Sequence, residues 1–414
     1  MAKKILYRRW QMPLIKKAMQ TRRVLLLSGP RQSGKTTLAK QLISKNREYR
    51  TLDDTTMFQA AQTDPQDFVK HSRQTLIIDE VQRVPALLSA IKKVVDEDNR
   101  PGQYLLTGSA NIQSLPGVTE SLAGRIRKIR LRPLTQGEIL GKLPKFLEQA
   151  FKQSFLFAQK YAHYDKEAIL KMTFRGGFPE AIRLEPRERK NWYKDYIESL
   201  LERDLQDIAN IRRKESMRKL LKVLAAWSSK FMDISAIGSG LSLQRHTIES
   251  YINALETLYL VEQLHPWAST DYARIAKHSK LFMTDCGLMS SLLGWRMEQI
   301  RLDGDKVGKM METFIFNELA AQVEASNQAF ELFHYRDREQ REIDFLVENE
   351  DGDLLGIEVK ASSTVTKDNF KHIRWFKENL ATKRSFIGIV LYTGELPLSF
   401  GDNMWSIPIG MLWS

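Results

Sequence analysis

The sequence predicts an α/β fold whose first third forms a doubly wound parallel sheet. Short apolar runs at residues 24–28 (VLLLS), 75–79 (TLIID) and 103–108 (QYLLTG) indicate strands that are buried on both faces of a sheet. Helical patterns lie between these runs, at residues 36–45 and 85–97. Alternation of strands and helices in this order is typical of a doubly wound α/β domain.

The rest of the chain shows three further patterns. Residues 136–235 are almost wholly helical, apart from the glycine turn RGGFP at residues 175–179. Residues 214–285 show a helix, a short helix, a helix and a hairpin, which is the order of a winged helix-turn-helix. From about residue 300, a long helix, three strands, a second helix and a further strand indicate a separate α/β domain.

Length, charge and cysteine content limit the class of protein. At 414 residues the chain is long enough for about two to four domains, and no apolar run approaches the ~20 residues of a membrane span. The single cysteine, Cys286, excludes an intramolecular disulfide and a CxxC site, so we expect a cytoplasmic protein that is not bound to a membrane. A net charge of +13 favours a polyanionic partner, nucleic acid first, although a mildly basic surface is the simpler explanation.

An eight-residue motif, GPRQSGKT at residues 29–36, predicts a phosphate-binding loop. Gly29 and Gly34 let the backbone curl so that its N–H groups point at phosphate oxygens. Lys35 would reach the β- and γ-phosphates of ATP, and the Thr36 hydroxyl would bind Mg²⁺. A strand precedes the motif and a helix follows it, as the motif requires. The expected nucleotide contacts are Gly29, Pro30, Arg31, Gln32, Ser33, Gly34, Lys35, Thr36 and Thr37.

Two later strand ends supply the remaining parts of an ATP-hydrolysing site. Asp79 ends the second apolar run and would hold Mg²⁺ through water, while Glu80 after it would polarise the attacking water. The third run leads to Ser109, which would sense the γ-phosphate, with Thr107 as the alternative. Strand ends also carry Ser and Thr for reasons of turn formation.

Arg125 follows a glycine beyond the third strand and is the candidate arginine finger. Such a residue enters the site of a neighbouring subunit and neutralises transition-state charge, with an effect of ~10³–10⁵ on the rate. Basic residues continue at every second or third position, so this segment could instead be the solvent face of a strand. These residues are Arg127, Lys128, Arg130 and Arg132.

Several motifs, taken in order, resemble one family. They are GPRQSGKTTL, IIDEVQRVPALL, LLTGSAN, SLAGRI…LRPLT, RGGFPEA and LERDL…I. Over nearly its whole length the chain is similar to the bacterial and archaeal AAA-type ATPases that carry a C-terminal DUF4143 domain. The resemblance implies an AAA+ core that uses ATP and Mg²⁺. It also implies a homo-oligomer, such as a hexameric ring, in which arginine fingers act in trans.

The last third of the chain carries a second candidate site. Residues 342–360 alternate as a β-hairpin, which would place Asp344 directly across from Glu358, with their Cβ atoms about 5 Å apart. Two carboxylates so placed can share a Mg²⁺ or Mn²⁺ ion. Lys360 returns to the same face, where it can orient water or stabilise developing charge. Glu312, on the preceding helix, is a fourth candidate.

This pattern resembles the PD-(D/E)xK nuclease core, which has a restriction-endonuclease-like α/β fold. It departs from that family because Ile343 stands where a proline precedes the aspartate. An amphipathic hairpin with these residues on its polar face is the competing interpretation, and a nuclease fold can persist as a platform that does not cleave. We expect four domains: an ATPase core at 1–135, a helical lid or linker at 136–213, a winged helix at 214–295 and a nuclease-like domain at 296–414.

The helix-turn-helix pattern predicts a contact with DNA. Gln244, Arg245 and His246 occupy the first turn of the predicted recognition helix, where side chains reach base edges. The basic residues expected in the wing are Arg274, Lys277 and Lys280. A module that only packs against the ATPase lid is the alternative.

Together these features predict an ATP-hydrolysing motor that remodels, translocates or processes branched DNA, with a nuclease-like domain attached. The competing hypothesis is a regulatory switch, in which ATP turnover controls protein assembly and the C-terminal domain is inert. Stimulation of ATP hydrolysis by DNA distinguishes the two hypotheses.

Overall fold

The computed structural model describes residues 6–43, 47–109, 124–154, 161–204, 214–268 and 278–413. The chain forms two compact units, the first containing residues 1–133 and 253–260 and the second containing residues 134–252 and 261–414. The first boundary lies close to residue 135, where the ATPase core was expected to end. Apart from residues 253–260, the expected lid, winged helix and C-terminal domain share the second unit, and their separate boundaries stay predictions.

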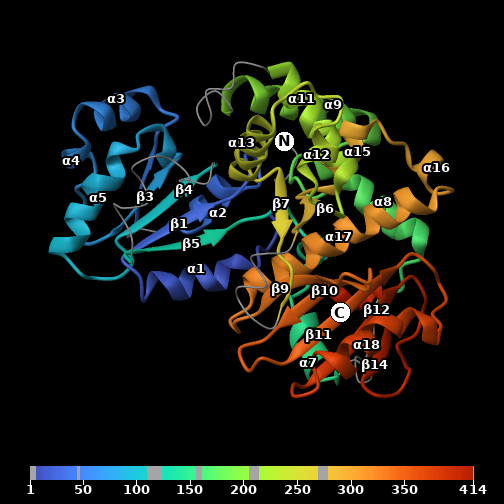
Figure 1. Cartoon of the computed structure of the whole chain (residues 1–414). Coiled ribbons are helices and arrows are strands. Elements are labelled where there is room, and N and C mark those ends of the chain that lie inside the picture. Colours follow the sequence, from blue (N-terminus) through green and yellow to red (C-terminus); the bar gives the residue numbers. More distant parts are fainter. Residues whose placement is uncertain are drawn as a thin grey trace. The chain divides into compact units, whose positions relative to one another are not determined.

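The first unit contains a five-stranded parallel sheet with the strand order β2-β3-β4-β1-β5 (Figure 1). Its strands are β1 (Val24–Ser28), β2 (Arg47–Thr51), β3 (Thr75–Asp79), β4 (Tyr104–Gly108) and β5 (Ile126–Arg130). Because the strands are parallel, their carboxyl ends meet at one edge, where Ser28 pairs with Gly108 and Thr51 pairs with Asp79. The predicted α/β class is confirmed, although the polar strand β2 was not predicted.

Helices cover both faces of this sheet. They are α1 (Gln11–Met19), α2 (Lys35–Gln41), α3 (Thr55–Thr63), α4 (Pro65–Phe68) and α5 (Ala86–Glu97), with a short 3-10 helix, η1, at Val81–Arg83. Alternate residues of β1 enter two separate apolar clusters. Leu26 joins Ile91 of α5 in one cluster, and Leu25 joins Ile15 of α1 and Leu38 of α2 in the other. Burial on both faces explains why the central strands are continuously apolar.

The second unit begins with a mainly helical region. Its helices are α6 (Gln136–Ile139), α7 (Phe146–Phe151), α8 (Lys166–Arg175), η4 (Ala181–Arg183), α9 (Pro186–Ser199), η5 (Leu200–Asp204), α11 (Lys214–Trp227), α12 (Ile234–Gly238), α13 (Arg245–Thr257), α15 (Cys286–Leu293), α16 (Met297–Ile300) and α17 (Gly304–Ala325). The last residues of α13 belong to the first unit. A three-stranded antiparallel sheet, of order β6-β8-β7, consists of β6 (Lys230–Phe231), β7 (Val261–Leu264) and β8 (Lys280–Met283). The winged-helix assignment of this region stays a prediction.

A six-stranded mixed sheet of order β13-β14-β12-β11-β10-β9 forms the C-terminal part of the second unit. Its strands are β9 (Glu331–Arg336), β10 (Glu342–Glu348), β11 (Leu354–Lys360), β12 (Phe386–Tyr392), β13 (Leu398–Ser399) and β14 (Met404–Pro408), with helices η6 (Lys367–Phe370), α18 (Lys371–Asn379) and η7 (Ile409–Trp413). Strands β10 and β11 are antiparallel, with Phe345 opposite Ile357. The sequence predicted this register, in which the neighbouring residues Asp344 and Glu358 lie opposite each other.

Helices α17 and α18 cover opposite faces of this mixed sheet (Figure 1). Phe316 of α17 stacks with Phe345 of β10, with ring centroids 6.4 Å apart. The next strand residue, Leu346, instead shares an apolar cluster with Phe376 of α18. Because consecutive strand residues point to opposite faces, the two helices enclose the sheet from both sides. A side chain on β10 near α17 is therefore shielded from water.

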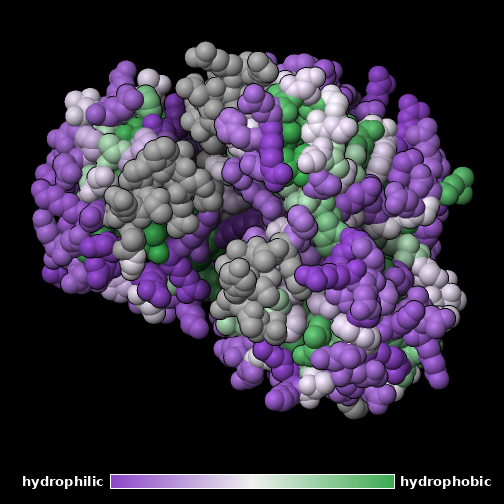
Figure 2. All heavy atoms as spheres, viewed as in Figure 1, coloured by the Kyte–Doolittle hydropathy of each residue, from purple (hydrophilic) through white to green (hydrophobic). Residues whose placement is uncertain are grey.

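In the part of the chain that the structure describes, no helix is both long and apolar enough to cross a membrane. The visible surface is mostly hydrophilic, with apolar residues in separate spots (Figure 2). The most exposed large apolar side chain in the described residues is Leu302, at 85%. Scattered apolar exposure of this kind is normal and does not by itself indicate a partner.

Candidate ATP site and C-terminal acidic cluster

The predicted phosphate-binding loop follows β1 and depends on two glycines. Gly29 has a φ of 152°, and a Cβ atom there would lie 2.1 Å from the carbonyl oxygen of Leu131. Gly34 has a left-handed backbone with a φ of 98° where α2 begins. Other residues would clash or be strained at these positions, so only glycine suits this curled backbone. The other predicted contacts in the loop and in the first turn of α2 are Pro30, Arg31, Gln32, Ser33, Lys35, Thr36 and Thr37.

Two buried cations hold the loop from within. The Lys35 ammonium donates hydrogen bonds to the carbonyl oxygens of Gly29, at 2.9 Å, and Pro30, at 2.7 Å. Arg9, which precedes α1, donates to the carbonyl oxygen of Ser33 at 2.9 Å. Lys35 is therefore centred on the loop, as a phosphate-binding lysine needs to be. The contribution of Arg9 was not predicted from the sequence.

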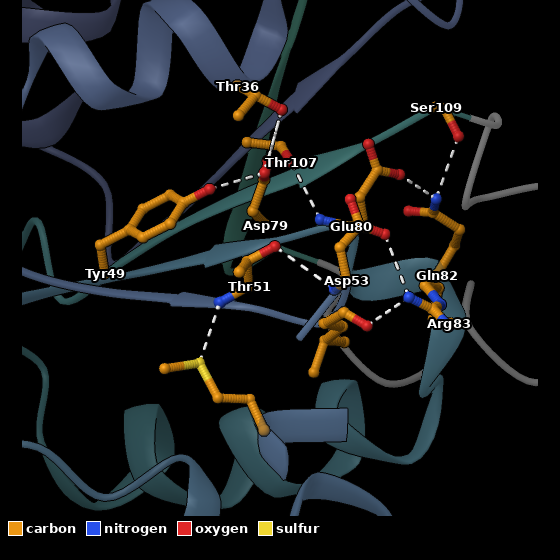
Figure 3. Close-up of polar contacts among 12 residues, drawn as sticks. Thr36, Tyr49, Thr51, Asp53, Asp79, Glu80, Gln82, Arg83, Thr107 and Ser109 are labelled. Atoms are coloured by element: carbon orange, nitrogen blue, oxygen red, sulfur yellow. Dashed lines mark hydrogen bonds and ion pairs between the residues drawn. The ribbon is translucent and has the colours of Figure 1, made fainter. Parts of the chain in front are cut away.

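The Asp79 carboxylate accepts hydrogen bonds from three hydroxyl groups at the carboxyl edge of the sheet (Figure 3). The Thr36 hydroxyl donates at 2.9 Å, the Tyr49 hydroxyl donates at 2.8 Å, and Thr107 donates to the other carboxylate oxygen. Burial and the neighbouring carboxylate raise the pKa of Tyr49, so the phenol remains a hydrogen-bond donor. The hydroxyl of Thr36 and the carboxylate of Asp79 are oxygen ligands of the kind that Mg²⁺ prefers, so these residues fit a Mg²⁺ site.

Glu80 lies beside this carboxylate on a left-handed backbone with a φ of 59°. Such a conformation costs a non-glycine residue about 1–3 kcal/mol, and hydrogen bonds from neighbours maintain it. The Glu80 N–H donates to the Thr107 hydroxyl at 3.1 Å. The Gln82 amide donates to the Glu80 carboxylate and, at 3.0 Å, to the Ser109 hydroxyl (Figure 3). Gln82 therefore joins the predicted water-activating acid to the predicted γ-phosphate sensor.

Arg125 lies just before β5, where Ile126 pairs with Val24 at the beginning of β1. The phosphate-binding loop follows the other end of β1, so Arg125 is at the opposite edge of the sheet from the loop of its own subunit. Its guanidinium forms an ion pair with Asp96 at the end of α5. Any action on bound ATP would therefore have to be in a neighbouring subunit.

The other arginines and the lysine considered with Arg125 have different surroundings. Lys128 and Arg130 lie over the ring of Tyr259, at 5.6 and 5.0 Å from its centroid. Arg132 is buried. The possibility that this segment is only a solvated strand face is therefore not supported for these three residues.

The second candidate site lies where β10, β11 and α17 meet. Its four acids, here called the acidic cluster, are Glu312, Glu342, Asp344 and Glu358. One Asp344 oxygen accepts a hydrogen bond from the Val359 N–H at 2.9 Å, and Lys360 contacts Glu358 at 3.3 Å. The structure thus brings together Glu312, Asp344, Glu358 and Lys360, which the sequence singled out.

A lysine that was expected on the surface lies inside this cluster. Lys280 of β8 is only 2% exposed, and its ammonium contacts Glu312, Glu342 at 2.7 Å and Asp344 at 3.6 Å. Its assignment to a basic DNA-binding wing is therefore wrong. The strand sequence Lys-Leu-Phe-Met is buried at every position, which carries the lysine inward with its apolar neighbours. The other two predicted wing residues, Arg274 and Lys277, lie outside the described residues.

Charge compensation in the cluster comes from this ammonium. Burial alone would lower the pKa of Lys280, but the carboxylates of Glu312, Asp344 and Glu342 raise it overall, so the lysine stays charged. Burial raises the pKa of Glu312 to about 8. Among the described residues, no group of three or more acidic, histidine or cysteine side chains is arranged to hold a metal ion. The donor set predicted for Mg²⁺ or Mn²⁺ does not fit a divalent ion as arranged here, because a protein cation lies among its carboxylates.

The first turn of α13 is accessible, as a recognition helix requires. Gln244, Arg245 and His246 are exposed. Arg245 forms an ion pair with Glu249 one turn later, at 2.9 Å. An exposed pair of this kind contributes little to stability, so Arg245 can exchange this partner for another anion at small cost.

Three residues whose contacts were not predicted differ in how clearly the sequence indicated them. Tyr49 lies on β2 between Glu48 and Arg50, and neither its type nor its spacing indicated a role. Gln82 follows the Asp79–Glu80 pair by two residues, which is a weak signal. Lys280 gave the clearest signal, because a lysine within an apolar strand is expected to be buried with acidic partners.

Three family models match separate parts of the chain. Residues 21–140 match an AAA domain, residues 166–299 match a domain of unknown function, DUF8612, and residues 307–412 match a domain of unknown function, DUF4143. The first and last matches confirm the resemblance that the motifs indicated. The central match covers α8 to α16 and assigns no role to them.

Among curated proteins, the chain is 27% identical over 396 residues to an uncharacterized protein of Mycobacterium tuberculosis, covering 95% of this chain and 82% of that protein. Among solved structures, it is similar to DnaA from Aquifex aeolicus bound to AMPPCP, with 15% identity, 59% of this chain and 86% of that chain covered, and a TM-score of 0.28. RuvB from Thermotoga maritima matches with 19% identity, 61% and 87% coverage, and a TM-score of 0.26. Similarity at these TM-scores is too weak to carry an argument about function.

Proposed function

We propose that this chain, which combines an AAA domain with a C-terminal DUF4143 domain, is an ATPase that acts on DNA as a motor. The observation that carries the ATPase part is the arrangement around Asp79. Residues from four segments that are distant in sequence meet there: Thr36 after the loop, Tyr49 on β2, Asp79 on β3 and Thr107 on β4. Such an arrangement suits a nucleotide site at the carboxyl edge of a parallel sheet.

In this proposal each residue of the ATP site has one task. Lys35 and the backbone of the glycine-rich loop bind the phosphates. Mg²⁺ held by Thr36 and Asp79 would neutralise charge on the transferred phosphoryl group. Glu80, the residue after Asp79, would accept a proton from the attacking water. Thr107 and Ser109, at the end of β4, are the positions from which the γ-phosphate would be sensed.

The hydrogen bonds of the Gln82 amide support a coupling between ATP hydrolysis and the conformation of the site. It joins Glu80 to Ser109, so a movement of either residue would change the other. A motor needs such a link, because its grip on the substrate has to depend on whether ATP or ADP is bound. Arg125 would extend this dependence to a neighbouring subunit in a homo-oligomer, and this is the reason to propose that the working form is an oligomer.

Charge supports DNA as the substrate. The chain carries 63 Lys and Arg residues against 50 Asp and Glu residues, and a basic excess of this size favours binding to a polyanion such as nucleic acid. The exposed first turn of α13 offers Gln244, Arg245 and His246 for direct contact. The proposal therefore includes binding of DNA through these three side chains.

The C-terminal domain is proposed to bind or organise rather than to cleave. The observation that favours this role is Lys280, whose ammonium occupies the centre of the carboxylates that a nuclease would use for its metal ion. The same observation favours the second candidate function, a regulatory ATPase switch with an inert C-terminal domain. In that case ATP turnover would respond to a protein partner and not to DNA.

The experiment that separates the candidates measures ATP hydrolysis with and without duplex, single-stranded and branched DNA. The motor proposal expects DNA to stimulate turnover, with Lys35→Ala and Glu80→Gln as inactive controls. Turnover that none of the three DNA forms changes, in a protein that hydrolyses ATP, would contradict the motor and favour the switch.

A further inference from the structure

A cavity of about 850 Å³ in the second unit is lined mainly by residues of α8, α9, α15 and α16 and of the segments beside them. Its volume falls within the ~300–1,000 Å³ that is usual for ligand sites. The lining includes Arg175, which begins the RGGFP turn, a motif that the ATP site does not use. Most of the lining also lies in the region that matches a domain of unknown function, residues 166–299.

One wall of the cavity is a rigid buried contact. Tyr193 of α9 is 1% exposed and packs closely on Gly287 of α15. A Cβ atom at position 287 would lie 2.4 Å from the Tyr193 hydroxyl. The Tyr193 hydroxyl donates to Asp285 at 2.9 Å, and Asp285 accepts from the N–H of Gly177 at 2.6 Å. These bonds join α9, α15 and the glycine turn, so the cavity is formed before any ligand binds.

The lining is strongly basic, with six cationic residues and one acid, Glu298. The cationic residues are Lys171, Arg175, Arg187, Arg189, Lys190 and Arg296. The Arg189 guanidinium donates hydrogen bonds to backbone carbonyl groups. Lys171 forms an ion pair with Glu167 at 2.9 Å. In contrast, the exposed side chains of three others form no hydrogen bond or ion pair with any residue that the structure describes. These three are Arg187, Lys190 and Arg296, and they can bind an anion without giving up a protein partner.

Aromatic side chains lie between these cations. Tyr164, Phe174 and Trp295 belong to the same lining, and each is partly exposed. A positively charged groove with accessible aromatic rings is the usual site for single-stranded nucleic acid, because phosphates contact the cations and bases stack on the rings. A duplex keeps its base faces stacked inside, so it could use the cations but not the rings.

We propose that this cavity binds a single-stranded segment of DNA. Phosphates contact Arg187, Lys190 and Arg296, and a base stacks on Trp295 or Tyr164. The inference rests on the proposed DNA-acting function and narrows its substrate to a strand with unpaired bases. An acidic peptide would satisfy the charges alone, and it is an outcome of the test.

The test measures fluorescence anisotropy of a labelled oligo(dT) with the full-length protein at several salt concentrations. Charge reversal in Arg187→Glu/Lys190→Glu should weaken binding at least tenfold and lower the salt slope by about 1.4, since single strands give about 0.7 per phosphate neutralised. Trp295→Ala should weaken it about 5- to 150-fold, the range expected for loss of one stacked base. The matched control is Lys367→Glu/Lys383→Glu, which makes the same charge change at exposed positions away from the cavity. Thermal unfolding checks that each variant is folded.

Three results would overturn the inference. If the folded Arg187→Glu/Lys190→Glu protein binds oligo(dT) as the control does while DNA stimulates ATP hydrolysis, the cavity is not the site that binds the single strand, although the proposed function stands. If poly-glutamate competes with oligo(dT) for wild type and Trp295→Ala binds normally, the ligand is an acidic peptide. If wild type binds no form of DNA at low salt and DNA does not affect turnover, both the cavity proposal and the proposed function fail.

Discussion

Replacing Lys280 by methionine tests whether this ammonium takes the place of a metal ion. Methionine matches the four-atom apolar stem of the lysine side chain and lacks only its terminal ammonium, so the main change is the loss of the charge. Three carboxylates lie within 4 Å of the ammonium, and the lysine is 2% exposed. Breaking a buried ion pair by removing one partner typically costs about 3–5 kcal/mol, and we expect a loss of this size at pH 8.

The loss should be smaller at lower pH. Burial already raises the pKa of Glu312 above the unfolded value of 4.5, and loss of the ammonium, which lowers this pKa, should raise it further. A raised folded pKa means that the folded state binds protons more tightly, so the variant should lose stability as pH rises above about 4.5. At pH 5.5 Glu312, whose pKa is about 8, is largely protonated, and most of the deficit relative to wild type should disappear.

The assay is urea unfolding at pH 5.5 and pH 8, without nucleotide, with and without Mn²⁺. The variant should regain stability with Mn²⁺, by about 2.7 kcal/mol at a concentration one hundred times its dissociation constant, because the acidic cluster can then hold a divalent ion. Wild type should not respond through this cluster. Lys383→Met, an exposed control, should change stability by less than about 0.5 kcal/mol.

Two results would refute the reasoning. One is a Lys280→Met protein as stable as wild type at pH 8, which would mean that the ammonium does not compensate the carboxylates. The other is a Mn²⁺ stabilisation of wild type that Asp344→Asn abolishes, since the cluster would then bind metal despite the lysine.

The remaining predictions concern hydrolysis, assembly and pH. Lys35→Ala should abolish ATP binding, whereas Glu80→Gln should bind ATP without turning it over, as equilibrium binding and phosphate release would show; normal turnover by Glu80→Gln would contradict its role. Arg125→Ala should keep ATP affinity and lose turnover by ~10³–10⁵, and mixing it with Lys35→Ala should restore some activity; normal hydrolysis by Arg125→Ala would exclude it as the finger. Burial raises the pKa of Glu318 to about 7, so its deprotonation should destabilise the fold between pH 4.5 and pH 7, by about 3 kcal/mol at most. Glu318→Gln should remove this dependence in unfolding measurements at the two pH values, and an unchanged pH profile would show that Glu318 is not its source.

Local sequence patterns predicted the elements of the ATP site with little error. The runs VLLLS and TLIID form β1 and β3 with the predicted bounds, because buried parallel strands require continuous apolar residues. The glycines of the phosphate-binding loop have the positive φ values that their positions demand. The hairpin register that places Asp344 opposite Glu358 also followed from the sequence, since the turn between β10 and β11 fixes the pairing.

What the sequence could not supply is the set of contacts between elements that are distant along the chain. Tyr49 reaches Asp79 across 30 residues, and Lys280 reaches Glu342 across 62. A pattern of apolar and polar residues shows which face of an element is buried, but not which element packs against that face. Only the packing of β8 beside α17 and β10 placed an ammonium among the carboxylates. The sequence by itself therefore determined the nucleotide-binding loop and the acidic hairpin, while the tertiary structure decided which cation the acids hold.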